Sequence, residues 1–229
     1  MEGVDLLRKN GINWGILMVV DKDSAEVAEL IWQFFVENGM TSVGFNPEEI
    51  SGVHHQSSLS YEGAEENVEN FYRILANLNN ESGNQVNIRE VDDMVSKIKA
   101  AKLPVHNGLV TPFEILSFDY LGNVSTFSPQ LLGQMHPEYG DFRFGNVYSG
   151  RIIDIGQSPK FKKVYLDVLK GVDSCRKSCT YFDVCAGGDP SAKLAEHDTF
   201  NVAETLECRL RTQASFNVVI RTLEEELHI

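Results

Sequence analysis

The chain has 229 residues, of which 42% are hydrophobic and 23% charged, and its formal net charge at pH 7 is -13. This is the composition of a folded globular protein, which excludes an intrinsically disordered chain. The length allows one large domain or a domain with an appendage. The negative charge disfavours nucleic acid as a partner, because Lys and Arg supply most of the affinity for phosphate.

The apolar and cysteine content give two further expectations about the class of protein. The longest apolar run near the N-terminus, residues 15–20, is far shorter than the roughly 20 residues of a membrane-spanning helix, and no signal-peptide pattern precedes it. A cytoplasmic protein without a membrane partner is therefore predicted. All four cysteines lie within residues 175–208, which favours a local metal site over a disulfide framework for the whole chain.

The N-terminal region reads as strand, helix, strand. Residues 13–20 form an apolar run typical of a strand buried on both faces of a parallel sheet. Ser24 is the expected N-cap of an amphipathic helix that ends near Gly39, and residues 41–46 give the second strand. A right-handed parallel crossover is the default for such a unit.

Two helices and then a change of architecture are expected in the middle of the chain. Helical spacing over residues 68–78 predicts one helix, and the Asn87 to Glu90 pattern resembles a capping box for another that continues to about Lys102. Residues 114–127 alternate like a hairpin with Gly122 and Asn123 in the turn. We therefore predict a first domain of residues 1–111 and a second of residues 112–229.

The second domain is expected to combine an ordered loop, two helices and the cysteines. Residues 129–145 show no period and predict a loop. Ser158 is the expected N-cap of a helix that ends at Gly171, four residues before the first cysteine. A final helix is predicted over residues 203–227, with Cys208 near its start.

The cysteines follow the spacing Cys175-x3-Cys179-x5-Cys185-x22-Cys208. Four thiolates satisfy either zinc or a [4Fe-4S] cluster. Zinc ribbons and fingers usually carry two closely spaced ligand pairs, whereas this spacing is wider and suits a larger cluster. Free buried cysteines or two disulfides are the alternatives that involve no metal. Arg176, Lys177 and Arg209 are expected to offset the negative charge of a cluster.

The cysteine segment resembles a known family. The quoted residues are Cys175-Arg-Lys-Ser-Cys179-Thr-Tyr-Phe-Asp-Val-Cys185-Ala-Gly-Gly-Asp-Pro190, Lys193, Glu196, Glu204-Thr205 and Cys208-Arg209. They are similar to the C-terminal cluster domain of radical SAM/SPASM peptide maturases, in particular those of glycine-rich-repeat peptides. Ala186 stands where that family's pattern has its first glycine. The similarity extends upstream through residues 122–129, 137–142 and 144–147, and more weakly to residues 45–48.

The resemblance implies an α/β fold: the C-terminal half of a partial TIM-like radical SAM barrel, then a β-hairpin and an α-helical and loop SPASM-type iron-sulfur domain. It implies one auxiliary [4Fe-4S] cluster on Cys175, Cys179, Cys185 and Cys208, because Ser125 and Ser128 occupy the hairpin region where some SPASM domains place further cysteines. The family's CxxxCxxC motif, which holds the cluster that reduces S-adenosylmethionine, does not occur in this sequence.

These observations predict a half-enzyme that acts in the modification of a ribosomally made precursor peptide. S-adenosylmethionine would be a cofactor only if another chain supplies the CxxxCxxC half-barrel, and a homodimer is the other expected assembly. Catalytic residues are not predicted. The alternative is a non-catalytic protein that binds a peptide or an electron-transfer partner, in which the four cysteines hold an iron-sulfur cluster or a structural zinc.

Overall fold

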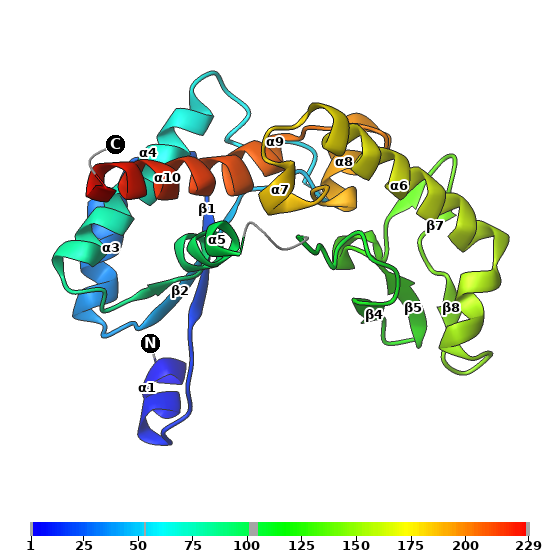
Figure 1. The fold of residues 1–229 in the computed structure, drawn as a ribbon. Coiled ribbons are helices and arrows are strands. Elements are labelled where there is room, and N and C mark those ends of the chain that lie inside the picture. Colours follow the sequence, from blue (N-terminus) through cyan, green and yellow to red (C-terminus); the bar gives the residue numbers. More distant parts are fainter. Residues whose placement is uncertain (1, 53, 101–104, 228–229) are drawn as a thin grey trace. The chain divides into compact units, whose positions relative to one another are not determined.

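The computed structural model describes residues 2–52, 54–100 and 105–227 (Figure 1). The chain forms an α/β fold in two compact units. The first unit contains residues 1–48, 57–100 and 209–229, and the second contains residues 49–56 and 101–208. The sequence placed a boundary at residues 111/112, whereas the first unit also includes the last helix. In the described residues no helix is long and apolar enough to cross a membrane.

A three-stranded parallel sheet organises the first unit. Its strands are β1 (Ile16–Val20), β2 (Ser42–Pro47) and β3 (Asn87–Ile88), in the order β1-β2-β3. The register pairs Ile16 with Val43 and Ser42 with Asn87, which confirms the predicted parallel strand-helix-strand unit. The strands of such a sheet are joined by helices, because a parallel connection must return to the starting edge.

The prediction that the first strand is buried on both faces is wrong. Leu17 and Val19 of β1 are 68% and 60% exposed, whereas Val20 is fully buried. Helices of the first unit cover the other face, where the Phe45 ring of β2 packs against Phe35 and Phe71. Within this unit one face of the sheet is therefore covered, and on the open face β1 exposes the apolar side chains of Leu17 and Val19.

Helices α1 (Glu2–Lys9), α2 (Lys22–Ala25) and α3 (Ala28–Glu37) lie around the first two strands. Asp21, and not Ser24, is the N-cap of α2. The Asp21 carboxylate accepts from the Ser24 N–H at 2.9 Å, and the Ser24 hydroxyl accepts from the Asp21 N–H at 2.8 Å. This is a reciprocal capping box in which Ser24 is the third helical residue, so the predicted helix divides into two.

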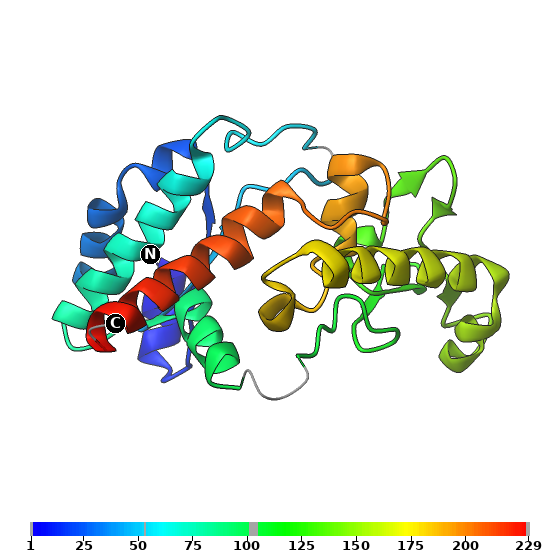
Figure 2. The ribbon, with the colours of Figure 1, turned by 45° about the horizontal axis from the view of Figure 1, so that its top comes forward.

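Three longer helices complete the first unit (Figure 2). They are α4 (Ala64–Glu81), α5 (Arg89–Lys99) and α10 (Ala214–Leu227), and α10 lies beside both α4 and α5. The predicted continuation of α5 to Lys102 lies outside the described residues. The final helical stretch begins with α9 (Leu206–Cys208) and a π-helical segment, η3 (Arg209–Gln213), that leads into α10.

The predicted Asn87 capping box is wrong, and Glu90 instead completes the edge of the sheet. Strand β3 pairs only with Ser42 and Val43 of β2. Farther along β2, the buried Glu90 carboxylate accepts from the Phe45 N–H at 3.0 Å, while Arg89 donates to the Phe45 carbonyl at 3.1 Å and pairs with Glu90. The Glu90 and Arg89 side chains thus satisfy the backbone N–H and carbonyl of Phe45, which a longer third strand would otherwise pair.

Substitution Glu90→Ala is expected to lower the free energy of unfolding by about 1–3 kcal/mol, because it leaves the buried Phe45 N–H without an acceptor. Asp93→Ala, on an exposed position of the same helix, should change stability by no more than about 0.5 kcal/mol. Urea unfolding of both variants measures the difference. Equal midpoints for the two variants would contradict this role of Glu90.

The second unit begins with small antiparallel sheets. β4 (Leu116–Phe118), β5 (Asn123–Thr126) and β8 (Gly145–Asn146) form one, and β6 (Met135–His136) and β7 (Gly140–Asp141) form the other. The pairing of β4 with β5 confirms the predicted hairpin, with Gly122 at a φ of 78° in the turn and Asn123 already in β5. Short 3-10 turns, η1 (Pro129–Leu131) and η2 (Ile152–Gln157), flank the loop region.

Helices α6 (Pro159–Ser178), α7 (Phe182–Cys185) and α8 (Pro190–His197) follow, and α9 ends the unit. Ser158 is confirmed as the N-cap of α6, since its hydroxyl accepts from the Phe161 N–H at 3.1 Å. Gly171 lies inside this helix and does not end it, so Cys175 is helical. The core of this unit is aromatic and aliphatic, and comprises Val124, Phe127, Leu131, Tyr139, Phe142, Phe144, Ile155, Phe161, Val164, Val168, Leu194 and Phe200.

Candidate metal centre

All four cysteines belong to the second unit and are free thiols. Cys175 lies in the last turn of α6, Cys179 follows at its C-cap, Cys185 ends α7 and Cys208 ends α9. Cys175 and Cys208 are buried, and the other two are half-buried. In the part of the chain that the structure describes, no three His, Cys, Asp or Glu side chains gather as a single metal ion requires. The surroundings of each sulfur are therefore described one by one.

The turn after Cys185 directs backbone N–H groups at its sulfur. Ala186, Gly187 and Gly188 have φ angles of 55°, 118° and 70°, a run of positive values that glycine adopts most easily. This turn lets the Gly188 N–H donate to the Cys185 Sγ at 3.2 Å. The Asn107 side-chain amide donates to the carbonyls of Cys185 and Gly188 at 3.2 and 2.9 Å and so holds the turn from outside.

The start of the final helical stretch presents Cys208. The Thr205 N–H donates to the Cys208 Sγ at 3.3 Å, and the Cys208 N–H donates to the Thr205 hydroxyl at 3.0 Å. The Glu196 carboxylate accepts from the Leu206 and Glu207 N–H groups, which satisfies the first donors of this helix. The π-helical segment η3 follows Cys208 directly, a distortion that is frequent at functional sites.

A buried lysine contacts Cys175. The Lys193 Nζ donates to the Cys175 Sγ at 3.2 Å and to the Gly171 carbonyl at 3.0 Å, and Lys193 is only 4% exposed. Cys175 in turn donates to the Ala203 carbonyl at 3.0 Å. A Cβ atom on residue 171 would clash with the Phe200 carbonyl and come within 3.2 Å of the Lys193 Nζ. Gly171 therefore lets the Phe200 backbone lie close to α6.

The three cations expected to offset the charge of a cluster have other partners. Arg176 and Lys177 form ion pairs with Asp173 on the exposed side of α6, and Arg209 pairs with Glu65 at 2.8 Å. Lys193 was missed as the cation that contacts a cysteine sulfur. Its place in the quoted motif was a signal, but its direct contact with Cys175 could be found only in the fold.

Burial makes Cys185 and Cys208 poor acids when no metal is bound. Desolvation raises the pKa of Cys185, an effect that the N–H donors of Gly187 and Gly188 partly oppose. Desolvation also raises the pKa of Cys208 to about 12, and the nearby Glu207 adds to the shift. These thiols are neutral at pH 7 without metal. Binding of a metal by these cysteines as thiolates would release protons and would therefore strengthen as the pH rises.

Ser128 anchors the chain just beyond the cysteine turn. Its hydroxyl oxygen lies within hydrogen-bond distance of the Ser191 hydroxyl (2.9 Å) and of the Asp189 carboxylate (3.2 Å), and all three side chains are buried. Asp189 also caps α8 by accepting from the Ser191 N–H at 2.7 Å. At this point of the hairpin region the structure therefore has a hydrogen-bonded cluster of oxygen atoms.

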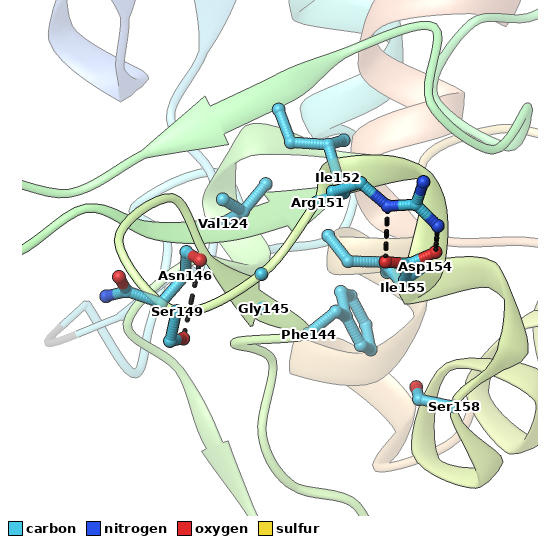
Figure 3. Close-up of a pocket in the computed structure, with 11 residues that line it drawn as sticks. Val124, Phe144, Gly145, Asn146, Ser149, Arg151, Ile152, Asp154, Ile155 and Ser158 are labelled. Atoms are coloured by element: carbon cyan, nitrogen blue, oxygen red, sulfur yellow. Dashed lines mark hydrogen bonds and ion pairs between the residues drawn. The ribbon is translucent and has the colours of Figure 1, made fainter.

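Two surface pockets lie in the second unit. One, of about 240 Å³, has Arg151 and Asp154 at its rim, bonded to each other at 2.7 and 2.9 Å (Figure 3); no cysteine lines it. The other, of about 370 Å³, includes Ala186 of the cysteine turn among its lining residues, together with apolar and charged side chains. The second pocket is the one adjacent to the candidate metal centre.

The fold and this site together define an α/β protein with four thiols in one unit. No family model matches it. It is 38% identical over 227 residues to the uncharacterized protein sll1766 of Synechocystis sp. (strain ATCC 27184 / PCC 6803 / Kazusa), covering 99% of this chain and 57% of that protein.

Solved structures show the same fold at low sequence identity. Histidine-tagged anSMEcpe with bound AdoMet matches with a TM-score of 0.69 and 20% identity, over 98% of this chain and 57% of that chain. Native anSMEcpe with bound AdoMet and Cp18Cys peptide matches with a TM-score of 0.65 and 18% identity, over 98% and 60%. The chain thus spans somewhat more than half the length of the proteins that it matches.

Proposed function

We propose that this chain is a radical SAM/SPASM-type iron-sulfur protein that takes part in the modification of a ribosomally made peptide, and that it requires a partner chain for radical chemistry. The observation that carries the proposal is the set of donors aimed at three of the four cysteine sulfurs: Gly188 N–H on Cys185, Thr205 N–H on Cys208 and the Lys193 ammonium on Cys175. Such hydrogen bonds stabilise thiolates and tune the metal that they hold.

The donor set fits a [4Fe-4S] cluster held by Cys175, Cys179, Cys185 and Cys208. Iron-sulfur clusters are held by Cys thiolates, and four are available in one compact unit. A single zinc ion would need the four sulfurs about 2.3 Å from it, so they would have to converge on one point. Four cysteines separated by spacings of three, five and 22 residues suit the wider cluster better. When bound, such a cluster supplies one-electron transfer.

The chain's own residues would position and shield that group. Asn107 and the glycine pair fix the turn that carries Cys185, and Glu196 fixes the start of the helix that carries Cys208. Burial of Cys175 and Cys208 excludes water from their sulfurs. The pocket beside Ala186 is where we propose that a peptide approaches this unit, which fits the presence of peptide in a structure of the same fold.

A partner chain is proposed because all four cysteines are assigned to one centre. Proteins of this fold that bind AdoMet are longer than this chain. The open face of the sheet, with Leu17 and Val19 exposed on β1, supports a second polypeptide that covers it, since long exposed apolar sheet surfaces promote association. That polypeptide would carry the CxxxCxxC half-barrel, and a second copy of this chain is the other arrangement.

Metal identity tests the proposal most directly. We expect protein purified anaerobically to contain about four irons and four acid-labile sulfides per chain. Cys185→Ala should lose most of both, whereas Ser178→Ala, an exposed residue beside Cys179, should keep them. Elemental analysis and sulfide assay give the measurement. Stoichiometric zinc without iron in the wild type would overturn the redox role and leave a structural site.

A further inference from the structure

We propose that Lys193 is the positioning residue that holds the Cys175 sulfur as a cluster ligand and sets the reduction potential of the centre. The inference rests on the proposed function, because it concerns the cluster that Cys175 would ligate. It assigns to Lys193 an electrostatic role that the sequence had given to Arg176, Lys177 and Arg209.

The burial of Lys193 calls for a negative partner. An ammonium group that is 4% exposed is costly unless it is paired. In the described part of the chain its two hydrogen bonds go to a carbonyl oxygen and to a cysteine sulfur, and no carboxylate pairs with it. A cluster-bound Cys175 would supply the negative charge that this ammonium group needs. Lys193 is therefore best matched to the loaded state.

The other groups around Cys175 point to the same conclusion. The carbonyls of Ala203 and Gly187 lie 3.0 and 3.8 Å from its Sγ, and both are acceptors, so neither offsets the negative charge of a cluster ligand. The N–H donors described above serve Cys185 and Cys208. Lys193 is thus the donor that the structure provides for Cys175.

Residue 171 of α6 has to be a glycine beside this contact. Gly171 lacks the Cβ atom that would crowd the Lys193 Nζ and the Phe200 carbonyl. The lysine reaches α6 from α8, 18 residues farther along the chain than Cys175.

The sign of the effect on the potential follows from charge. Reduction adds an electron, so a positive charge and a hydrogen bond at a ligand sulfur favour the reduced state. Lys193→Met keeps much of the side-chain volume and removes both. We expect the equilibrium constant for reduction of the reconstituted full chain to fall at least tenfold. This corresponds to a decrease of about 59 mV in the midpoint potential for one electron. A redox titration followed by visible absorbance measures it.

Lys177→Met is the matched control, because it removes the same charge from a side chain that is 73% exposed. Water and salt screen that position, so its shift should stay below tenfold. A potential for Lys193→Met within the same limit would overturn the inference. A wild-type protein without iron and sulfide would instead overturn the proposed function itself, and the two failures are distinguished by metal analysis.

Thermal unfolding of metal-free and reconstituted protein distinguishes a role of Lys193 in the loaded state from a general effect on folding. We expect Lys193→Met to lower the unfolding midpoint of the loaded protein more than that of the metal-free protein. Loss of iron from a variant that keeps its metal-free midpoint also supports the inference, since it shows that the lysine serves the loaded state. Equal losses in both states, or a metal-free variant that does not fold, would assign Lys193 a structural role and overturn the inference.

Discussion

Substitution Cys208→Ser is expected to remove most of the bound iron while changing the metal-free fold little. The hydroxyl can replace the thiol as acceptor of the Thr205 N–H, so we expect the metal-free unfolding free energy to stay within about 1 kcal/mol of wild type. Loss of the thiolate removes the ligand that joins the final helical stretch to the cysteines of α6 and α7. The centre would then lack its fourth ligand.

The same variant should lose the stabilisation that metal confers on the folded state. A metal centre that binds only the folded chain stabilises it in proportion to the logarithm of its concentration over Kd. Substitution of one metal-binding residue therefore has a large effect on the stability of the loaded protein. Iron and sulfide analysis, with thermal unfolding before and after reconstitution, tests both parts. Full retention of iron would show that Cys208 is not a ligand. Unfolding of the metal-free variant would show that Cys208 is needed for packing.

The 229-residue chain, even when loaded and reduced, is expected to cleave no S-adenosylmethionine by itself. With four cysteines in the sequence and all four assigned to one centre, no three thiolates remain for the second cluster that this chemistry requires in the resembling family. Addition of a polypeptide with a CxxxCxxC motif, for example one encoded beside this gene, should start the cleavage. Mass spectrometry of the nucleoside products under reducing conditions measures it.

The controls separate the two functional readings. The same mixture made with Cys185→Ala should still bind the partner, whose own cluster is unchanged. It should lose activity toward the peptide, because this chain's centre lacks a ligand. Cleavage by the isolated, loaded chain would overturn the half-enzyme proposal. Peptide binding without any cleavage in the mixture would favour the alternative, a non-catalytic protein that binds a peptide or an electron-transfer partner.

Local patterns explain the predictions that succeeded. The strand-helix-strand unit, the β4-β5 hairpin and the Ser158 N-cap depend on residues close in sequence, whose apolar spacing and turn chemistry are visible without a fold. The set of four cysteines was likewise chosen from spacing. It stays a prediction, as do the cluster and the partner chain.

The wrong predictions share a different cause. Ser24 and Asn87 are plausible caps by composition, but each competed with a neighbour, and the tertiary structure chose Asp21 for one helix and used Glu90 to complete the edge of β2 for the other. The apolar β1 pattern could not distinguish a strand covered on both faces from one with an open face, because periodicity records what a strand prefers to bury, not what covers it.

By itself the sequence determined the parallel pairing of β1 and β2, the β4-β5 hairpin, the start of α6 and the four candidate ligands, since all of these follow from local periodicity and residue type. Only the tertiary structure decided that Lys193 contacts Cys175, that Gly171 lets the Phe200 carbonyl approach α6 and that the last helix belongs to the first unit. Such contacts join residues far apart in the chain. They arise where surfaces of several elements become complementary, a property that no single segment carries.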